Sequence, residues 1–198
     1  FETYRAEVQA LLRRLGVHRV RFLDEPVAAA LGYGLSLSQE RTVLVVDVGG
    51  GTMHVVLLRL SPGAAGGQAT VLGKRGRPLG GNAVDGWVLE VVCRQLGHDF
   101  SRDAGDEVDR IWRRLMLAEA RRVKEAVFFT DDAAFLMSPP TLPLGPLRPG
   151  KDVVTLTRVG LRQLLDQNGF YRGLTASLDE VLEQAKIQAR DVDDVLLV

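Results

Sequence analysis

Hydrophobic and polar positions divide the beginning of the chain into helical and extended segments. A helix is predicted over 2–15, and Gly16 is the residue expected to end it. A short apolar run predicts a strand at 20–23, and an alanine-rich stretch predicts a second helix over 27–35. The apolar residues of the first helix recur at intervals of three and four: Val8, Leu11, Leu12 and Leu15.

Three extended segments follow, and they form the most apolar part of the chain. Residues 42–48 and 54–60 are apolar runs rich in β-branched side chains, which predicts two buried strands. A third strand is predicted over 69–74. Because only a short glycine-rich segment separates the first two runs, they are expected to form a hairpin.

The rest of the chain is predicted to be mostly helical. In chain order, the predicted elements are a helix from about 82 to 96, a helix over 106–128, paired strands at 128–129 and 133–137, a strand over 153–156, helices over 158–167 and 171–188, and a strand over 195–198. Asn82 and Thr157 are the predicted N-caps of two of these helices. This order of elements indicates an α/β or α+β architecture with a helical insertion.

Between the first two predicted strands lies a triple glycine preceded by an acid. Gly49, Gly50 and Gly51 allow positive φ angles and carry no Cβ, so the backbone N–H groups of the turn are able to converge on an anion. Asp47 stands where the first strand ends, in a position to hold a metal ion or a water, and Thr52 adds a hydroxyl group. The alternative is a simple glycine hairpin with an incidental Asp.

A second acid, Glu25, follows the predicted strand at 20–23 and precedes Pro26. Ligands commonly bind at the carboxyl ends of strands in an α/β sheet, which makes Glu25 a candidate site residue. The alternative is a capping acid in the first turn of a helix. The basic residues of the helix over 106–128 also have two interpretations, either ligand contacts or a solvated charged face.

Composition narrows the range of partners. Of the 198 residues, 46% are hydrophobic and 25% are charged, with a formal net charge of zero, so a dominant nucleic-acid-binding surface is not expected. The single cysteine, Cys93, excludes an internal disulfide framework and favours a reducing compartment such as the cytoplasm.

No apolar run has the length of a membrane span. The chain lacks an initiator Met and a signal peptide, and both ends interrupt predicted elements, so an excised piece of a longer protein is expected.

Several common catalytic patterns are absent from the sequence. It contains no G-x-x-x-x-G-K-[ST] loop, no G-x-G-x-x-G loop and no G-x-S-x-G elbow. Its three histidines are scattered without the spacing of metal ligands. The remaining candidate is therefore one anion-binding glycine turn with one carboxylate.

Three motifs, in this order, resemble the signatures of DnaK-type, seventy-kilodalton heat-shock chaperones. They are DEPVAAALGYG over 24–34, VLVVDVGGGTMHVVLL over 43–58 and LGGNAVD over 79–85. The resemblance covers the whole chain and implies the second lobe of the ATPase domain, an α/β lobe of the actin-like, ribonuclease H-like fold with a mixed sheet. It implies a core subdomain of about 1–77 and 152–198, and an inserted helix-rich subdomain of about 78–151.

The resemblance also implies the cofactors, ATP or ADP with Mg²⁺, and the residues that bind them. Asp47 and Glu25 would be the catalytic acids and would hold Mg²⁺ through water. Helix residues around 120–127 would approach the adenine and the ribose. The implied nucleotide-contacting residues are Gly49, Gly50, Gly51, Thr52, Gly80, Gly81, Arg121 and Lys124.

The implied partners are the first lobe of the same ATPase domain, a J-domain co-chaperone, a nucleotide-exchange factor and client polypeptides, with no nucleic acid and no membrane. The sequence also departs from the family pattern: His54, Asn82 and Ala83 stand at acidic positions, and in 120–127 the usual Glu, first Lys and Ser are lost or shifted by one. The alternative function is therefore a divergent chaperone-like binding module with weak or no ATPase activity. A sugar kinase of the same superfamily is a third interpretation, which the chaperone-like stretch at 25–30 disfavours.

Overall fold

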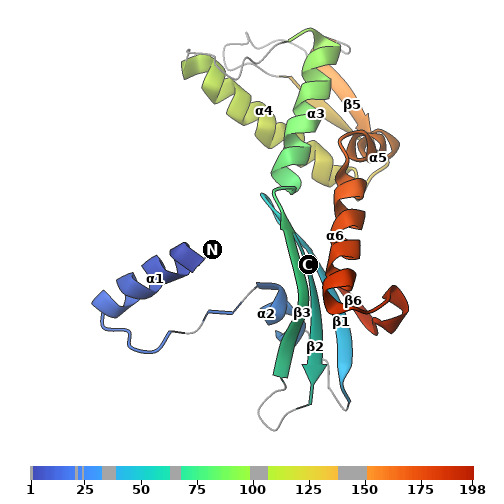
Figure 1. The fold of residues 1–198 in the computed structure, drawn as a ribbon. Helices are drawn as coiled ribbons and strands as arrows, with labels where there is room; N and C mark the ends of the chain where they lie inside the picture. The colour runs from blue at the N-terminus through green and yellow to red at the C-terminus, as the bar shows by residue number, and fades with distance from the viewer. Residues whose placement is uncertain are drawn as a thin grey trace.

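The structure is a computed structural model that describes residues 2–20, 22–23, 25–32, 39–62, 68–98, 107–137 and 151–198. Its main parts are a four-stranded sheet with helices against it and a helix-rich unit beyond one end of that sheet (Figure 1). A helix near the N-terminus, α1 (Glu2–Arg14), confirms the helix predicted over 2–15. No helix in the described part of the chain is both long enough and apolar enough to span a membrane.

The sheet is mixed and contains, in spatial order, β3 (Gln68–Arg77), β2 (Met53–Ser61), β1 (Arg41–Val48) and β6 (Asp194–Leu197). β1 and β2 form an antiparallel hairpin, and β3 pairs antiparallel with β2. β6 pairs parallel with β1. All four strands lie in the segments that the apolar runs predict, and the prediction of a mixed sheet is confirmed.

The side chains of successive residues in β1 lie on opposite faces of the sheet, as in any pleated strand. Val45 packs in a core cluster with α2 (Glu25–Gly32), whereas Val46 packs in a second cluster with α6 (Phe170–Ala185). Asp47 is the next residue after Val46, so it lies on the face that α2 covers.

The helix-rich unit is built from α3 (Gly81–Leu96), α4 (Glu107–Ala126), β4 (Asp132–Leu136), β5 (Val153–Thr157) and α5 (Arg158–Gln167). β4 and β5 pair antiparallel, and α3 and α4 share a core with the fully buried side chain of Phe135. Leu161 and Leu164 of α5 belong to this core as well. The division at 78–151 stays a prediction, and this packing favours a second boundary near Gly169.

Two predicted strands are not found among the residues that the structure describes. The described residues of 20–23 are not in a strand, and 128–129 form a turn that continues from α4. In this turn the amides of 128–129 donate to the carbonyl oxygens of Glu125 and Ala126, as in a last helical turn. Both predictions are wrong because a short apolar run forms a strand only where a neighbouring strand pairs with it, and the partner of β4 is β5.

Two helix boundaries show how local capping decides where a helix begins or ends. The helix predicted over 171–188 ends at Ala185, because Lys186 adopts a left-handed φ of 55°. The predicted N-cap of α5 is confirmed. The Thr157 hydroxyl oxygen accepts a hydrogen bond from the Gly160 amide at 3.0 Å.

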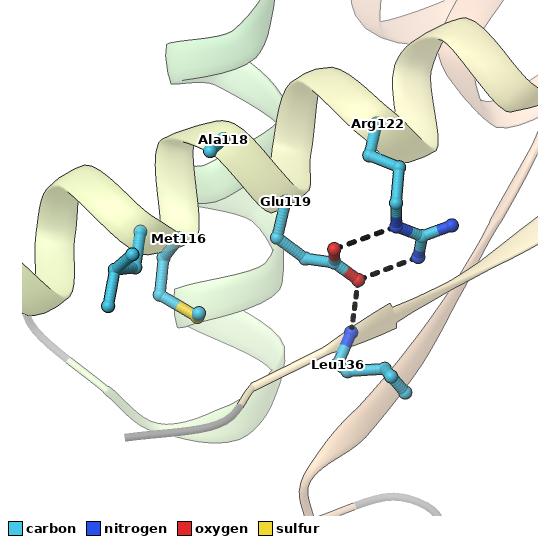
Figure 2. A pocket seen from close by; sticks show the side chains of 6 residues that line it. Met116, Ala118, Glu119, Arg122 and Leu136 are labelled. Atoms are coloured by element: carbon cyan, nitrogen blue, oxygen red, sulfur yellow. Dashed lines mark hydrogen bonds and ion pairs between the residues drawn. The ribbon is translucent and has the colours of Figure 1, made fainter. Parts of the chain in front are cut away.

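An open pocket lies between α4 and β4, with an ion pair in its wall (Figure 2). The Glu119 carboxylate accepts hydrogen bonds from the Arg122 guanidinium at 2.7 and 2.8 Å and from the Leu136 amide at 3.1 Å. Arg122 also donates to the Ala134 carbonyl oxygen at 2.7 Å. These contacts occupy polar groups on the edge of β4, which disfavours the addition of another strand there. The pocket is lined by Leu115, Met116, Ala118, Glu119, Arg122 and Leu136.

Replacing Glu119 with glutamine is expected to loosen β4 in a pH-dependent way. Burial opposes ionisation of Glu119, but hydrogen bonds from Arg122 and Leu136 outweigh it and lower the pKa of Glu119 from its usual 4.5. A lowered pKa means that the ionised carboxylate stabilises the fold above pH 4.5, and that this stability is lost as the pH falls through the lowered pKa. Because Arg122 is half-exposed, we expect the substitution to lower the free energy of local unfolding of β4 by only about 1 kcal/mol at pH 7.

Hydrogen exchange of the β4 amides in the intact protein measures this effect. At pH 7 the Glu119→Gln variant should exchange about 5-fold faster than the wild type, and the ratio should approach 1 as the pH is lowered below 4.5. Glu125→Gln, an exposed carboxylate on the same helix, is the control and should leave the ratio at 1 at every pH. A ratio for Glu119→Gln that does not change with pH would contradict the expectation.

Candidate functional site

The triple glycine forms the connection between β1 and β2. It closes with a hydrogen bond from the Gly49 amide to the Thr52 carbonyl oxygen at 2.9 Å. None of the three glycines has a positive φ, so the prediction of positive φ angles in this turn is wrong. Their contribution is the missing Cβ: a Cβ on Gly51 would meet no atom within 4 Å, which leaves open space in front of the backbone.

Three backbone N–H groups of the turn are available to a ligand. Gly50, Gly51 and Thr52 are exposed, and none of their amides is a donor in the hydrogen bonds of the described residues. Successive N–H groups without an acceptor form a site for an anion. Thr52 is exposed and adds a hydroxyl group at the same turn, and amide and hydroxyl donors of this kind suit the oxygens of a phosphate.

The first turn of α3 packs directly against the glycine turn. The amides of Gly81 and Asn82 donate to the carbonyl oxygens of Gly49 and Gly50 at 3.0 and 2.7 Å. A Cβ on Gly80 would lie 2.6 and 2.7 Å from the same two oxygens, so this approach requires glycine. The N-cap of α3 is Gly80, without a side-chain cap, so the prediction of Asn82 as N-cap is wrong.

Two basic residues of α4 reach this junction, and both bind Asp85 of α3. The Lys124 Nζ lies 2.6 Å from the Asp85 Oδ1 and donates to the Gly81 carbonyl oxygen at 3.2 Å. The Arg121 Nε lies 3.3 Å from the Asp85 Oδ2, and its Nη2 donates to the Asn82 Oδ1 at 2.7 Å. Asp85 and Lys124 are largely buried and Arg121 is half-exposed, so one carboxylate faces two cations next to the turn.

Asp47 is buried at the end of β1, on the strand that leads into the glycine turn. It lies opposite His54 in the β1–β2 register, and the His54 Nδ1 is 3.9 Å from the Asp47 Oδ2. Gly76 of β3 leaves room for the His54 ring, because a Cβ there would approach the ring to 3.0 Å. The predicted acid therefore stands beside the turn, with a histidine as its cross-strand neighbour.

Glu25 is the first residue of α2, and it is exposed. The helix predicted over 27–35 thus begins two residues earlier, and 33–35 lie outside the described residues, as does the side chain of Pro26. Because α2 packs on β1 and β2, Glu25 belongs to the element that covers the face bearing Asp47. Its position in the first turn is also the position of a capping acid.

The described residues contain no group of three or more His, Cys, Asp or Glu side chains able to hold a metal ion. The His, Cys, Asp and Glu side chains of the described residues therefore do not form a site for a metal bound entirely by protein, such as a structural zinc. The donor set fits Mg²⁺, which takes one or two carboxylates and fills its remaining positions with water and phosphate oxygens. Asp47 is one carboxylate that lies next to the turn.

The sequence matches the family model described as Hsp70 protein over residues 2–198. The "Chaperone protein HscA homolog" of Shewanella amazonensis is 41% identical over 122 residues, which cover 59% of this chain and 17% of that protein. The homologue with the same description from Acidithiobacillus ferrooxidans is 33% identical over 138 residues, which cover 70% of this chain and 21% of that protein.

A eukaryotic relative extends the similarity over almost the whole chain. A ribosome-associated molecular chaperone of Zygosaccharomyces rouxii is 33% identical over 194 residues, which cover 92% of this chain and 28% of that protein. The chain therefore spans between 17% and 28% of the length of these three relatives.

Proposed function

The chain belongs to the Hsp70 family, whose nucleotide-binding domain has the actin-like ATPase fold, and from this premise we propose that it forms part of a chaperone ATPase domain. In this proposal the intact protein binds ATP or ADP with Mg²⁺ and couples hydrolysis to a conformational change that acts on client polypeptides. The catalytic acids are Asp47 and Glu25. The nucleotide-contacting residues are Gly49, Gly50, Gly51, Thr52, Gly80, Gly81, Arg121 and Lys124.

One observation carries the proposal: the exposed N–H groups of Gly50, Gly51 and Thr52 have no acceptor among the described residues. The β- and γ-phosphates of a nucleotide supply oxygens of the kind that such a turn accepts. Lys124 and Arg121 add positive charge beside it, partly offset by Asp85. Stabilisation of phosphate charge by fixed N–H groups and cations is the main requirement of phosphoryl transfer.

Mg²⁺ would neutralise charge on the phosphates and orient water, and Asp47 with Glu25 would hold it through water molecules. Asp47 is buried on the face that α2 covers, so it is fixed in place before any ligand binds. The hydrogen bonds from Gly81 and Asn82 to the turn join the sheet to the helix-rich unit. This connection supports the proposal that a change at the phosphates moves one unit relative to the other.

The partners of the intact protein belong to the same proposal. They are the first lobe of the ATPase domain, a J-domain co-chaperone, a nucleotide-exchange factor and client polypeptides, as expected of the Hsp70 family. A reducing compartment such as the cytoplasm is proposed because the chain has a single cysteine, which is buried. Calorimetric titration of the intact protein with MgATP tests the function. Binding with Mg²⁺-dependent hydrolysis supports it, and no binding overturns it.

Gly51→Ala is expected to weaken MgATP binding without disturbing the fold. A Cβ at this position meets no protein atom within 4 Å, and the φ angle is not positive, so alanine fits the free protein. The added methyl group would occupy the space through which a phosphate approaches the N–H groups, with an expected loss of about 10-fold in affinity. Gly32→Ala also meets no atom within 4 Å and is the control. Unchanged affinity in Gly51→Ala would contradict the proposed phosphate site.

A further inference from the structure

His54 and Asp47 place two side chains with metal-donor atoms next to each other, two residues before the glycine turn begins. They are directly opposite in the antiparallel register of β1 and β2, so both side chains lie on the same face of the sheet. The side chain of Asp47 is 10% exposed and that of His54 is 22% exposed. The pair is therefore mostly shielded from water but can be reached by a small ion.

The orientation of the imidazole ring decides which of its nitrogens faces the carboxylate. The Nδ1 lies 3.9 Å from the Asp47 Oδ2. The opposite edge of the ring lies against β3, where a Cβ on Gly76 would approach the Cδ2 to 3.0 Å and the Nε2 to 3.3 Å. Gly76 thus leaves room for the ring, and packing on β3 keeps the Nδ1 on the side of Asp47.

The distance between the Nδ1 and the carboxylate oxygen suits a shared ion better than a hydrogen bond. A hydrogen bond between nitrogen and oxygen has a length of about 2.7–3.2 Å, which 3.9 Å exceeds. Metal–ligand bonds of about 2.1 Å place two donors of one octahedral ion between about 3 Å and about 4 Å apart. The described residues offer no group of three or more such side chains, so water and phosphate oxygens would complete the coordination.

Resting on the proposed function, we propose that His54 is a direct ligand of the metal ion that accompanies the nucleotide, and that it shifts the preference of the site from Mg²⁺ to a divalent transition metal. Mg²⁺ is a hard cation that binds oxygen and keeps its waters, so an imidazole adds little to its binding. First-row transition metals bind sites with mixed nitrogen and oxygen donors. Mn²⁺ is the weakest binder of that series, which makes it the most stringent probe.

Two measurements on the intact protein test this inference. Calorimetric titrations with ADP in the presence of Mg²⁺ or Mn²⁺ give the ratio of the two affinities, and electron spin-echo spectroscopy of bound Mn²⁺ detects a coordinated nitrogen. The wild type should show coupling to an imidazole nitrogen. Its preference for Mn²⁺ over Mg²⁺ should be at least about 10-fold greater than that of His54→Asp, because a second carboxylate supplies oxygen to both ions alike.

A second variant and a control isolate the imidazole. His54→Gln removes the ring without placing another acid beside Asp47, and it should lose the nitrogen coupling while it still binds ADP with Mg²⁺. His18→Gln is the matched control, because His18 is an exposed histidine in the segment between α1 and α2. This control should keep both the nitrogen coupling and the affinity ratio of the wild type.

The outcomes separate the inference from the function on which it rests. Wild-type Mn²⁺ without nitrogen coupling, or an affinity ratio that is unchanged in both His54 variants, overturns the role of His54 while the nucleotide site stands. Nitrogen coupling that persists in both variants also overturns it, because another group then supplies the nitrogen. If the wild type binds ADP with neither ion, the proposed function and this inference fail together. The wild-type spectrum decides between these outcomes even if a variant does not fold.

Discussion

Replacing Asp47 with asparagine is expected to reduce steady-state ATP hydrolysis by the intact protein by at least about 100-fold. Asparagine has nearly the same shape but no charge, so it removes the proposed support for Mg²⁺ and the attacking water. This effect is expected because Asp47 is buried beside the glycine turn and lies opposite His54 in the β1–β2 hairpin.

Phosphate release at saturating MgATP measures the loss, and calorimetry reports whether the nucleotide still binds. Asp194→Asn is the control, because Asp194 lies on β6, the parallel neighbour of β1, and pairs with Arg41 near the surface. That variant should hydrolyse ATP at the wild-type rate. Hydrolysis by Asp47→Asn within about threefold of the wild type would remove Asp47 from the catalytic machinery.

Gly80→Ala is expected to destabilise the junction between the glycine turn and α3 by about 3 kcal/mol and to weaken MgATP binding with it. The backbone of Gly80 is extended, with φ −146° and ψ −173°, so alanine is allowed there by its own dihedral angles. The cost is steric. The new Cβ would lie 2.6 Å from the Gly49 carbonyl oxygen and 2.7 Å from that of Gly50, and the backbone must move apart.

Such a movement also lengthens the hydrogen bonds from Gly81 and Asn82 to the turn. Hydrogen exchange of these two amides, together with the thermal midpoint, measures the effect in the intact protein. Gly86→Ala is the matched control in the same helix, because a Cβ at Gly86 meets no atom within 4 Å. Gly86→Ala should stabilise α3 by about 0.5–1 kcal/mol, whereas Gly80→Ala should destabilise the protein. Equal behaviour of the two variants would contradict the close approach at Gly80.

The sequence predicts the sheet well because hydrophobic pattern and fold agree there. Four apolar segments become four strands, and alternate residues of β1 pack against α2 and α6. Thr157 is found as an N-cap because the cap is a local contact, three residues long. The strands expected at 20–23 and 128–129 fail for the opposite reason, since pairing depends on residues elsewhere in the chain.

The candidate site is predictable only in part. The sequence alone singles out the glycine turn, Asp47 and Glu25 as candidates. The expected positive φ angles are absent from the turn, and the glycines instead leave open space in front of the backbone. The roles of Asn82 and Asp85 are missed, because their partner Arg121 lies 39 and 36 residues away. The signal available beforehand is an acid on the otherwise apolar buried face of α3, because such an acid requires a cation close by.

The parallel pairing of β6 with β1 has a consequence for the order in which the protein can fold. The Thr42 amide donates to the Asp193 carboxylate at 2.7 Å across a separation of 151 residues. During synthesis the helix-rich unit, which is continuous in sequence, can fold first, while the edge of β1 stays unpaired until β6 is made. Over that interval the newly made chain carries an open strand edge at β1, so this chaperone relative is itself exposed to aggregation until β6 has been made.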